Sequence, residues 1–201
     1  MEVTSIVLAG GKSLRLGKSK ALEIAGGKSL IERVIQQLKQ LSSHVLIATS
    51  REQFDLLVAI DAEILVDMYP NKGPLGGIYT GLMASRCSHN IVVACDMPFL
   101  NTRLLRHMVE LSRDFDAVVP TLSMGNIEPL HAVYSKACLN SIRTQLDSGQ
   151  LRVDSFLNKV RVRYVERSEC QRLDPQLLSF FNINYQSDLD RATTLATEQE
   201  P

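Results

Sequence analysis

The chain has 201 residues, 45% of them hydrophobic and 22% charged, which is the composition of an ordinary soluble globular protein with one sizeable core. Its 22 basic side chains balance 22 acidic ones, so the overall charge creates no field that would hold nucleic acid or an anionic membrane. No apolar run approaches the roughly 20 residues of a membrane-spanning helix, and no signal peptide opens the sequence, so we expect a cytoplasmic protein.

Short β-branched runs alternate with amphipathic segments along the whole chain. Strands are predicted over residues 3–8, 44–49, 63–66, 90–95 and 117–119. Helices are predicted from the apolar faces of residues 30–41 and 104–109, with Asn101 as the N-cap of the second, and over residues 187–195. This alternation, without a long linker, predicts an α/β domain with a mostly parallel sheet. Ligands of such a domain bind beyond the carboxyl ends of the strands.

Cysteine and histidine side chains give no sign of a metal centre. The cysteines are widely spaced and form no C-x-x-C pair, which favours four reduced thiols: Cys87, Cys95, Cys138 and Cys170. The histidines are equally scattered, and the sequence predicts no special chemistry for His44, His89, His107 and His131.

The hexapeptide AGGKSL occurs twice, at residues 9–14 and 25–30. Both copies end like a P-loop, but that loop also needs a glycine at the positions held here by Ile6 and Leu22. The second copy precedes an apolar helical face, and its Ser29 has a glutamate three positions later, the spacing of a capping box. We therefore predict that the second copy is structural.

The first copy has a different setting, because it follows a predicted strand directly. It opens the loop GGKSLRLGKSK, residues 10–20, which is dense in glycine and in cations. Gly10 and the other glycines of the loop allow backbone amides to approach an anion closely. Arg15 and Lys20 can add charge-assisted hydrogen bonds. The sequence therefore predicts a polyphosphate site in this loop.

Three further segments carry residues suited to the same site. Asp67 leads into GPLGG at residues 73–77, whose glycines indicate either close approach to a flat base or ribose, or a simple turn before a helix. Asp96 ends a buried strand, which suits a Mg²⁺ ligand beside phosphates, with an N-cap role as the alternative. Asn182 and Asn184 alternate along a short extended segment before the last helix, where turn chemistry is the other interpretation.

Together these motifs resemble a known family. LAGG at residues 8–11, followed by Arg15, Gly17 and Lys20, is similar to the signature of nucleotidyltransferases with a three-layer, Rossmann-like fold. The later motifs resemble those of the molybdenum cofactor guanylyltransferases in particular: GPLGG, Asp96-Met97-Pro98, EPLHAVY at residues 128–134 and Asn182-Ile183-Asn184. The resemblance runs from about residue 5 to residue 191, nearly the whole chain.

The resemblance implies an enzyme that transfers GMP from GTP to the terminal phosphate of molybdopterin and releases pyrophosphate, with Mg²⁺ as cofactor. It implies one domain over residues 1–201, whose N-terminal half binds the nucleotide and whose C-terminal half binds the acceptor. The implied partners are GTP, molybdopterin, and either molybdoenzyme apoproteins or cofactor-insertion proteins.

The resemblance also implies residue roles. The catalytic residues are Asp96, which also holds the metal, and Lys20 and Arg15, which bind the triphosphate. The GTP site as a whole comprises Leu8, Ala9, Gly10, Lys20, Asp67 and Asp96. Asn182 and Asn184 are implied at the metal and acceptor site. Relatives carry a stretch like Gly149 to Arg152 before a helix, and a guanidinium suits a second phosphate, so Arg152 is predicted to bind the acceptor, with a surface arginine that binds nothing as the alternative.

Two positions depart from the family's pattern. Ser19 stands where aspartate is frequent, and Ala48-Thr49-Ser50 stands where relatives often supply an asparagine that contacts the nucleotide. The alternatives on this fold are a molybdopterin cytidylyltransferase and a sugar-1-phosphate nucleotidyltransferase. Cytidine-using relatives typically read LAAG where this chain reads LAGG, and the second glycine would leave room for a purine. Sugar-activating members commonly carry a C-terminal extension, for which the length of 201 residues leaves no room. A GTP-binding module without turnover is a further alternative, against which Lys20 and Asp96 argue.

Overall fold

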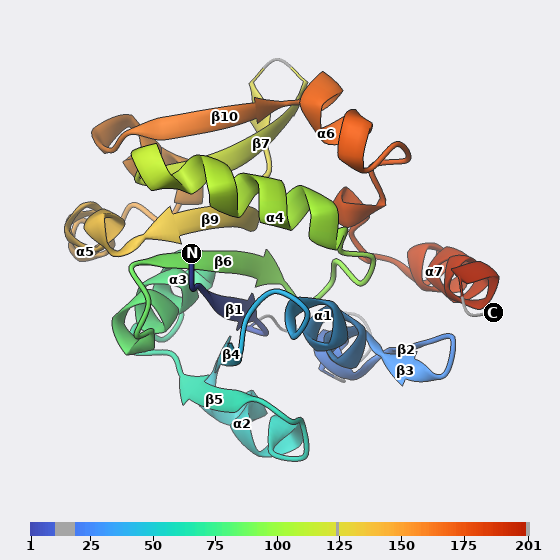
Figure 1. The fold of residues 1–201 in the computed structure, drawn as a ribbon. Helices are drawn as coiled ribbons and strands as arrows, with labels where there is room; N and C mark the ends of the chain where they lie inside the picture. Colours follow the sequence, from blue (N-terminus) through green and yellow to red (C-terminus); the bar gives the residue numbers. More distant parts are fainter. Residues whose placement is uncertain (11–18, 124, 200–201) are drawn as a thin grey trace.

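The computed structural model describes residues 1–10, 19–123 and 125–199. Within these ranges the protein is built on one sheet with the strand order β10-β7-β9-β6-β1-β4-β5, and β8 pairs with β7 (Figure 1). Its strands are β1 (Thr4–Leu8), β4 (His44–Thr49), β5 (Glu63–Val66), β6 (His89–Ala94), β7 (Ala117–Ser123), β8 (Asn126–Ile127), β9 (His131–Ser135) and β10 (Val162–Glu166). A separate hairpin consists of β2 (Ile24–Ala25) and β3 (Lys28–Ser29).

The α-helices are α1 (Leu30–Leu38), α2 (Arg51–Leu57), α3 (Gly73–Ala84), α4 (Thr102–Leu111), α5 (Leu139–Asp147), α6 (Arg167–Leu173) and α7 (Gln186–Gln199). Short 3-10 helices connect some of these elements, among them η1 (Lys20–Leu22), η4 (Val153–Lys159) and η5 (Leu178–Phe180). No described helix has the length and apolar character needed to cross a membrane.

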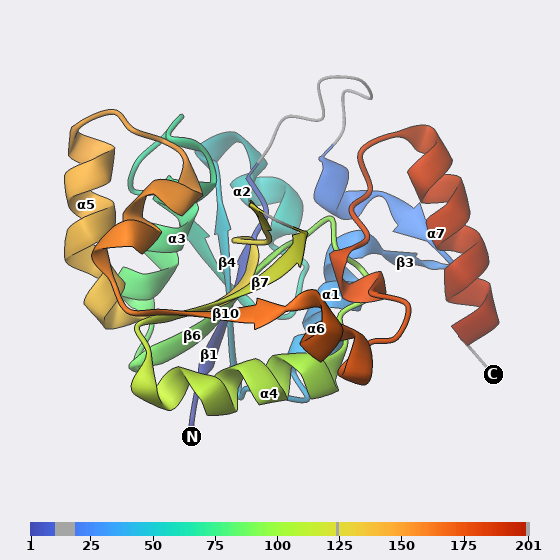
Figure 2. The same ribbon diagram turned by 90° about the horizontal axis from the view of Figure 1, so that it is seen from above.

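The sheet is buried on both faces, which gives the three layers that the sequence predicts. The apolar sides of α1 and α4 pack on one face, and those of α3, α5 and η4 pack on the other (Figure 2). The predicted strands at residues 44–49 and 63–66 have the predicted bounds, and β1 pairs in parallel with both β4 and β6. The prediction of an α/β fold with a mostly parallel sheet is confirmed. The antiparallel pairs are those of β9 with both its neighbours and that of β8 with β7.

Two glycines of α3, Gly77 and Gly81, lie against the sheet. A Cβ atom on Gly81 would lie 2.5 Å from Cγ2 of Ile6, and one on Gly77 would lie 3.1 Å from Cδ2 of Leu8. These glycines therefore let α3 approach β1 closely. The GPLGG stretch does begin a helix, as one interpretation of the sequence expects, and Gly77 closely approaches the Leu8 side chain of β1.

The second AGGKSL copy is structural, as predicted. Ser29 accepts a hydrogen bond from the backbone N–H of Glu32, and the Glu32 carboxylate accepts one from the backbone N–H of Ser29, so the capping box is complete. The turn at Gly26 lies against α7, which packs beside the hairpin (Figure 2). Arg33 completes the turn by donating to the carbonyl oxygens of Ala25 and Gly26.

Gly26 is the position in this turn where a side chain should cost most. Its φ is +56°, and a Cβ atom would lie 2.6 Å from both Cβ of Ala196 and Nη2 of Arg33. We expect Gly26→Ala to lower the free energy of unfolding by about 2–4 kcal/mol, from left-handed backbone strain plus overpacking. Gly27→Ala is the matched control, since Gly27 has φ +79° with no atom near its Cβ position. Urea denaturation of both variants measures the difference, and equal losses would contradict the packing of α7 on this turn.

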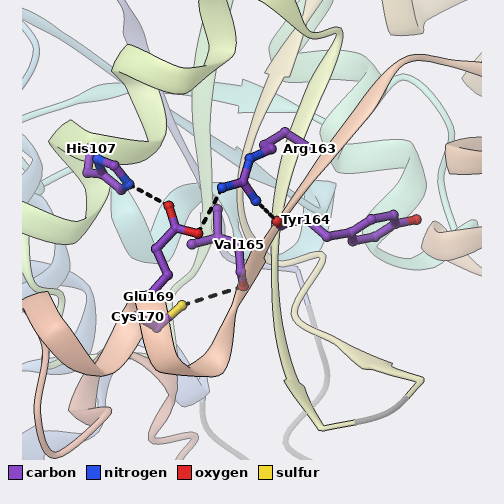
Figure 3. Close-up of polar contacts among 6 residues, drawn as sticks. All are labelled: His107, Arg163, Tyr164, Val165, Glu169 and Cys170. Carbon is purple, nitrogen blue, oxygen red and sulfur yellow. Dashed lines mark hydrogen bonds and ion pairs between the residues drawn. The ribbon is translucent and has the colours of Figure 1, made fainter.

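A polar cluster fixes α6 at the far edge of the sheet (Figure 3). The Glu169 carboxylate accepts from Nη2 of Arg163 at 2.8 Å and pairs with Nε2 of His107, also at 2.8 Å. The two partners come from β10 and α4, so one carboxylate ties three elements together. Burial alone would raise the pKa of Glu169, but these two bonds outweigh burial and the net shift is downward.

Candidate functional site

The carboxyl ends of β1, β4 and β6 are fastened to one another by hydrogen bonds. The N–H of Cys95 donates to Leu8 O at 3.1 Å, and the N–H of Ala9 donates to Ala48 O at 2.9 Å. The Thr49 hydroxyl donates to Ala9 O at 3.0 Å. Leu8 and Ala9 are therefore buried and fixed at this edge, and the exposed Gly10 follows them. Arg15, predicted to bind the triphosphate, lies outside the described residues.

Three predicted site residues meet at this edge although they are far apart in the sequence. The Lys20 ammonium lies 2.6 Å from Oδ2 of Asp96 and donates to Oδ1 of Asn184 at 2.9 Å. Lys20 opens η1, Asp96 follows β6, and Asn184 precedes α7. The side chains of Lys20 and Asp96 are 25% and 21% exposed, so the ion pair is screened from solvent yet still reachable by a ligand. This cluster is the centre of the candidate site.

Backbone contacts hold the segment that carries Asn184 in place. The N–H of Ile183 donates to the carbonyl oxygen of Asp96 at 3.1 Å. One Asp188 carboxylate oxygen accepts from the N–H groups of both Asn184 and Tyr185, each at 2.9 Å. These bonds lower the pKa of Asp188, which keeps it charged at the start of α7. The sequence analysis did not identify Asp188, although an acidic residue in a first helical turn is a recognisable capping signal.

Asp96 has the character of a metal ligand. Its Oδ2 atom pairs with Lys20, whereas its Oδ1 atom is buried and has no hydrogen-bond partner within the described residues. A buried carboxylate oxygen without a partner is costly unless a cation or donor satisfies it. Mg²⁺ takes one or two carboxylates together with phosphate oxygens and water, so a single aspartate beside a triphosphate is enough. The residues present fit a divalent metal.

Asp67 lies at the same edge, after β5, in a more apolar setting. Its Oδ1 atom accepts from the N–H of Tyr69 and from the Thr80 hydroxyl, both at 2.9 Å. A Cβ atom on Gly76 would lie 2.8 Å from its Oδ2 atom, so α3 approaches this carboxylate closely. Burial raises the pKa of Asp67 above its usual value, against the opposing effect of the two hydrogen bonds. Asp67 thus forms a fixed acceptor on the wall beside β1 and β4.

The two remaining acceptor predictions have no contact with this centre. Arg152 is exposed, and its guanidinium makes a bidentate pair with Asp154, with Nη2–Oδ2 and Nε–Oδ1 distances of 2.6 and 3.1 Å. This pair raises the pKa of Arg152 and lowers that of Asp154. Asn182 is half-buried, and its side chain makes no hydrogen bond to the described part of the chain. The structure therefore brings Lys20, Asp96 and Asn184 together, but neither Arg152 nor Asn182 joins them.

His131 is a feature that the sequence analysis missed. It opens β9 opposite Val93, its ring packs edge-on against Phe180 with centroids 4.9 Å apart, and it is fully buried. Neither ring nitrogen has a partner among the described residues, and burial lowers the pKa of the imidazole to about 3. The EPLHAVY motif was noted because it resembles a motif of the family. The sequence around a histidine at the start of a strand does not indicate whether its ring is buried.

The buried imidazole predicts a pH dependence of stability. In the unfolded chain His131 protonates below its ordinary pKa of about 6.5, whereas in the folded protein it stays neutral down to about pH 3. The unfolded state therefore binds the extra proton between these values. The free energy of unfolding should fall by about 1.4 kcal/mol per pH unit from this group as the pH drops below 6.5.

His131→Phe removes this titration and keeps a ring beside Phe180. Denaturant unfolding of the variant from pH 7 to pH 5 should give a flatter stability curve than that of the parent protein. His44→Gln is the control, since His44 is exposed at the start of β4 and its loss should leave the slope unchanged. Parallel curves for His131→Phe and the parent would show that the buried imidazole does not carry the dependence.

The chain is similar to known proteins over most of its length. Residues 5–163 match the MobA-like NTP transferase domain. The chain is 36% identical over 196 residues to a probable molybdenum cofactor guanylyltransferase of Pelotomaculum thermopropionicum, covering 98% of this chain and 94% of the relative. It is 35% identical over 192 residues to the molybdenum cofactor guanylyltransferase of Desulfosudis oleivorans, covering 94% of each.

Solved structures show the same architecture. Molybdopterin-guanine dinucleotide biosynthesis protein A from Archaeoglobus fulgidus superposes with a TM-score of 0.85 at 27% identity, over 98% of this chain and 100% of the other. The 2-C-methyl-D-erythritol 4-phosphate cytidylyltransferase of Thermus thermophilus superposes with a TM-score of 0.74 at 18% identity, over 98% and 100% of the two chains. The second likeness concerns the fold alone.

Proposed function

We propose that this chain, which belongs to the MobA-like NTP transferase family, transfers GMP from GTP to the terminal phosphate of molybdopterin and releases pyrophosphate. The proposal is supported by the names of the relatives taken together with the geometry of the site. Near full-length relatives are named molybdenum cofactor guanylyltransferases, and Lys20, Asp96 and Asn184 meet where such an enzyme needs its cation, its metal ligand and an amide.

In this proposal, residues at the carboxyl ends of the strands bind the nucleotide. Leu8, Ala9 and Gly10 line the nucleotide at the end of β1, and Asp67 accepts hydrogen bonds near the guanosine. Lys20 and Arg15 bind the triphosphate. The fixed, half-buried position of Asp67 supports its part in this assignment, and the nearness of Lys20 to Asp96 supports a triphosphate beside this pair.

The family points to a divalent metal, and we assign Mg²⁺ to Asp96. When bound, Mg²⁺ neutralises charge on the triphosphate as the leaving pyrophosphate departs. Asp96 holds that charge in place through a carboxylate whose loop is fastened to β1 by the Cys95 N–H. Lys20 supplies the second positive charge, and both groups act by position, because phosphoryl-type transfer depends mainly on alignment and charge.

The acceptor half lies toward the C-terminal part of the chain. Asn184 reaches the Lys20–Asp96 pair directly, and we place Asn182 beside it at the metal and acceptor site. Arg152 is assigned to the acceptor because its guanidinium is exposed and can exchange its Asp154 partner for an anionic group of that ligand. The finished dinucleotide would then pass to a cofactor-insertion protein or a molybdoenzyme apoprotein.

A nucleotide panel tests the proposal. The protein is incubated with Mg²⁺, molybdopterin and one of GTP, CTP or ATP labelled at the α-phosphorus. We expect label from GTP alone to enter a pterin dinucleotide, with one pyrophosphate released per transfer. Label from CTP would instead establish a cytidylyltransferase, and transfer to a sugar 1-phosphate in a parallel reaction would establish a sugar-activating enzyme. GTP binding without pyrophosphate release would leave only a binding module.

A further inference from the structure

A groove opens on the sheet beyond the Lys20–Asp96–Asn184 cluster, between β7, β8, η4 and β10. We call it the β7–β10 groove. Its volume is about 700 Å³, and the residues that matter in its wall are Leu122, Ile127, Asp154, Asn158, Tyr164 and Glu166. None of the functional assignments above uses this space, apart from the Arg152 partner Asp154 at its edge.

The groove lies within reach of the site. β7 runs parallel to β6 and is separated from it by β9 alone, so the two are two strand spacings, or about 10 Å, apart (Figure 1). β10, which carries Tyr164 and Glu166, is one spacing farther, at about 15 Å from β6. A short path along the chain also connects the groove wall to Asp96. Ile127 in the groove wall is three residues before Leu130, whose carbonyl accepts from the N–H of Ala94, two residues before Asp96. A flat ligand in the groove could therefore extend a short arm to the Lys20–Asp96 pair.

Tyr164 offers a ring face or edge to this ligand. It is 38% exposed on β10, and it points to the side of the strand opposite Arg163 and the Glu169 cluster (Figure 3). Leu122 and Ile127 supply further apolar surface. Exposed aromatic side chains beside apolar ones are the usual platform on which flat heterocycles stack.

The polar groups of the groove select the kind of heterocycle. Asp154 is held by Arg152, but Glu166 is exposed and makes no hydrogen bond or ion pair to the described residues. A free carboxylate accepts two parallel N–H donors, as it does from a guanidinium. The amino-pyrimidinone edge of a pterin presents such a donor pair. The wall also carries the Arg167 guanidinium, which donates to the carbonyl oxygen of Leu122. The phosphate end of the ligand faces the Lys20 side, because the attacking phosphate has to meet the triphosphate there.

From this arrangement we propose that the β7–β10 groove binds the pterin ring of the acceptor. The ring stacks on Tyr164, its amino-pyrimidinone edge is bound by Glu166, and Asn158 contacts its remaining polar edge. The proposal rests on the proposed function for the identity of the acceptor, but the groove's own residues determine the preference for a pterin.

The test compares Tyr164→Leu with Tyr164→Phe in the full chain. With molybdopterin as substrate, we expect Tyr164→Leu to raise the KM for molybdopterin about tenfold, the size of one lost stacking contact. GTP affinity and turnover at saturating acceptor should not change, and Tyr164→Phe should remain near the parent protein. A KM for molybdopterin that is unchanged in Tyr164→Leu, with transfer intact, would overturn the groove assignment.

A binding experiment separates this inference from the proposed function. Free pterin is fluorescent, and its titration with the protein needs neither GTP nor transfer. Saturable quenching by the parent protein that is weakened in Tyr164→Leu and in Glu166→Gln supports the groove even if no guanylyl transfer is found. Equal quenching by all variants overturns it even if transfer is found. Glu63→Gln is the matched control, because Glu63 is an exposed glutamate on β5 at the opposite edge of the sheet.

Discussion

Asp96→Asn should lower guanylyl transfer by on the order of a hundredfold, the usual cost of losing one positioned electrostatic group. The change is nearly isosteric and keeps an oxygen for Lys20, but it removes the negative charge that a divalent metal requires. It puts an amide NH2 where the buried, unpartnered carboxylate oxygen lies, and it replaces the ion pair with Lys20 by a hydrogen bond to the amide oxygen, so the fold should be kept with a small loss of stability. We therefore expect a folded protein that binds Mn²⁺ weakly and transfers slowly.

Three measurements check this expectation. Thermal unfolding should give a cooperative transition with a Tm near or slightly below that of the parent protein, Mn²⁺ binding followed by electron paramagnetic resonance should weaken, and turnover should fall. Asp55→Asn is the control, an exposed aspartate on α2 that should change none of the three. Turnover within about threefold of the parent would contradict the metal assignment, since a lost metal ligand costs far more.

Local patterns in the sequence predicted local structure well. The strands of the parallel half are short apolar runs, and their bounds at 44–49 and 63–66 are those observed. In β4 the run is apolar because all residues after His44 are buried. The capping box at Ser29 and the N-cap at Asn101 were readable too, since each depends on residues within one helical turn. Such signals need no knowledge of the rest of the fold.

Contacts between distant segments were not readable in this way. No pattern near residue 20 indicates that the Lys20 ammonium bonds Asn184, which is 164 positions away. The glycines of GPLGG predicted close approach correctly, but only the packing of α3 on β1 identifies a strand as the neighbour. The burial of His131 likewise arises from Phe180 on a distant 3-10 helix. The set of site residues was therefore predicted from the resemblance to a family, because the spacing of residues along the sequence does not show which distant segments meet.

Lys20→Met should have two effects of opposite direction. In the ligand-free protein the Lys20 ammonium bonds Oδ2 of Asp96 and Oδ1 of Asn184, two oxygens that a divalent cation could also use. Lys20 therefore competes with the metal for them until a triphosphate offers the ammonium another partner. Removing the ammonium should weaken GTP binding tenfold to about a hundredfold, the range for a charge-assisted hydrogen bond. The same change should tighten Mn²⁺ binding to the nucleotide-free protein severalfold.

Calorimetric titrations with GTP and with Mn²⁺ separate these effects, and Lys28→Met is the matched control. Lys28 lies in the second AGGKSL copy and donates to Gln36 on α1, so its loss should alter neither titration. If Lys20→Met weakens GTP binding but leaves Mn²⁺ affinity unchanged or lower, Lys20 serves the triphosphate alone and does not compete for the metal oxygens. If Mn²⁺ binds more tightly as expected, the pair explains how Asp96 keeps its charge and position before substrate arrives. The lysine would then exchange its carboxylate partner for a phosphate as the metal takes its place.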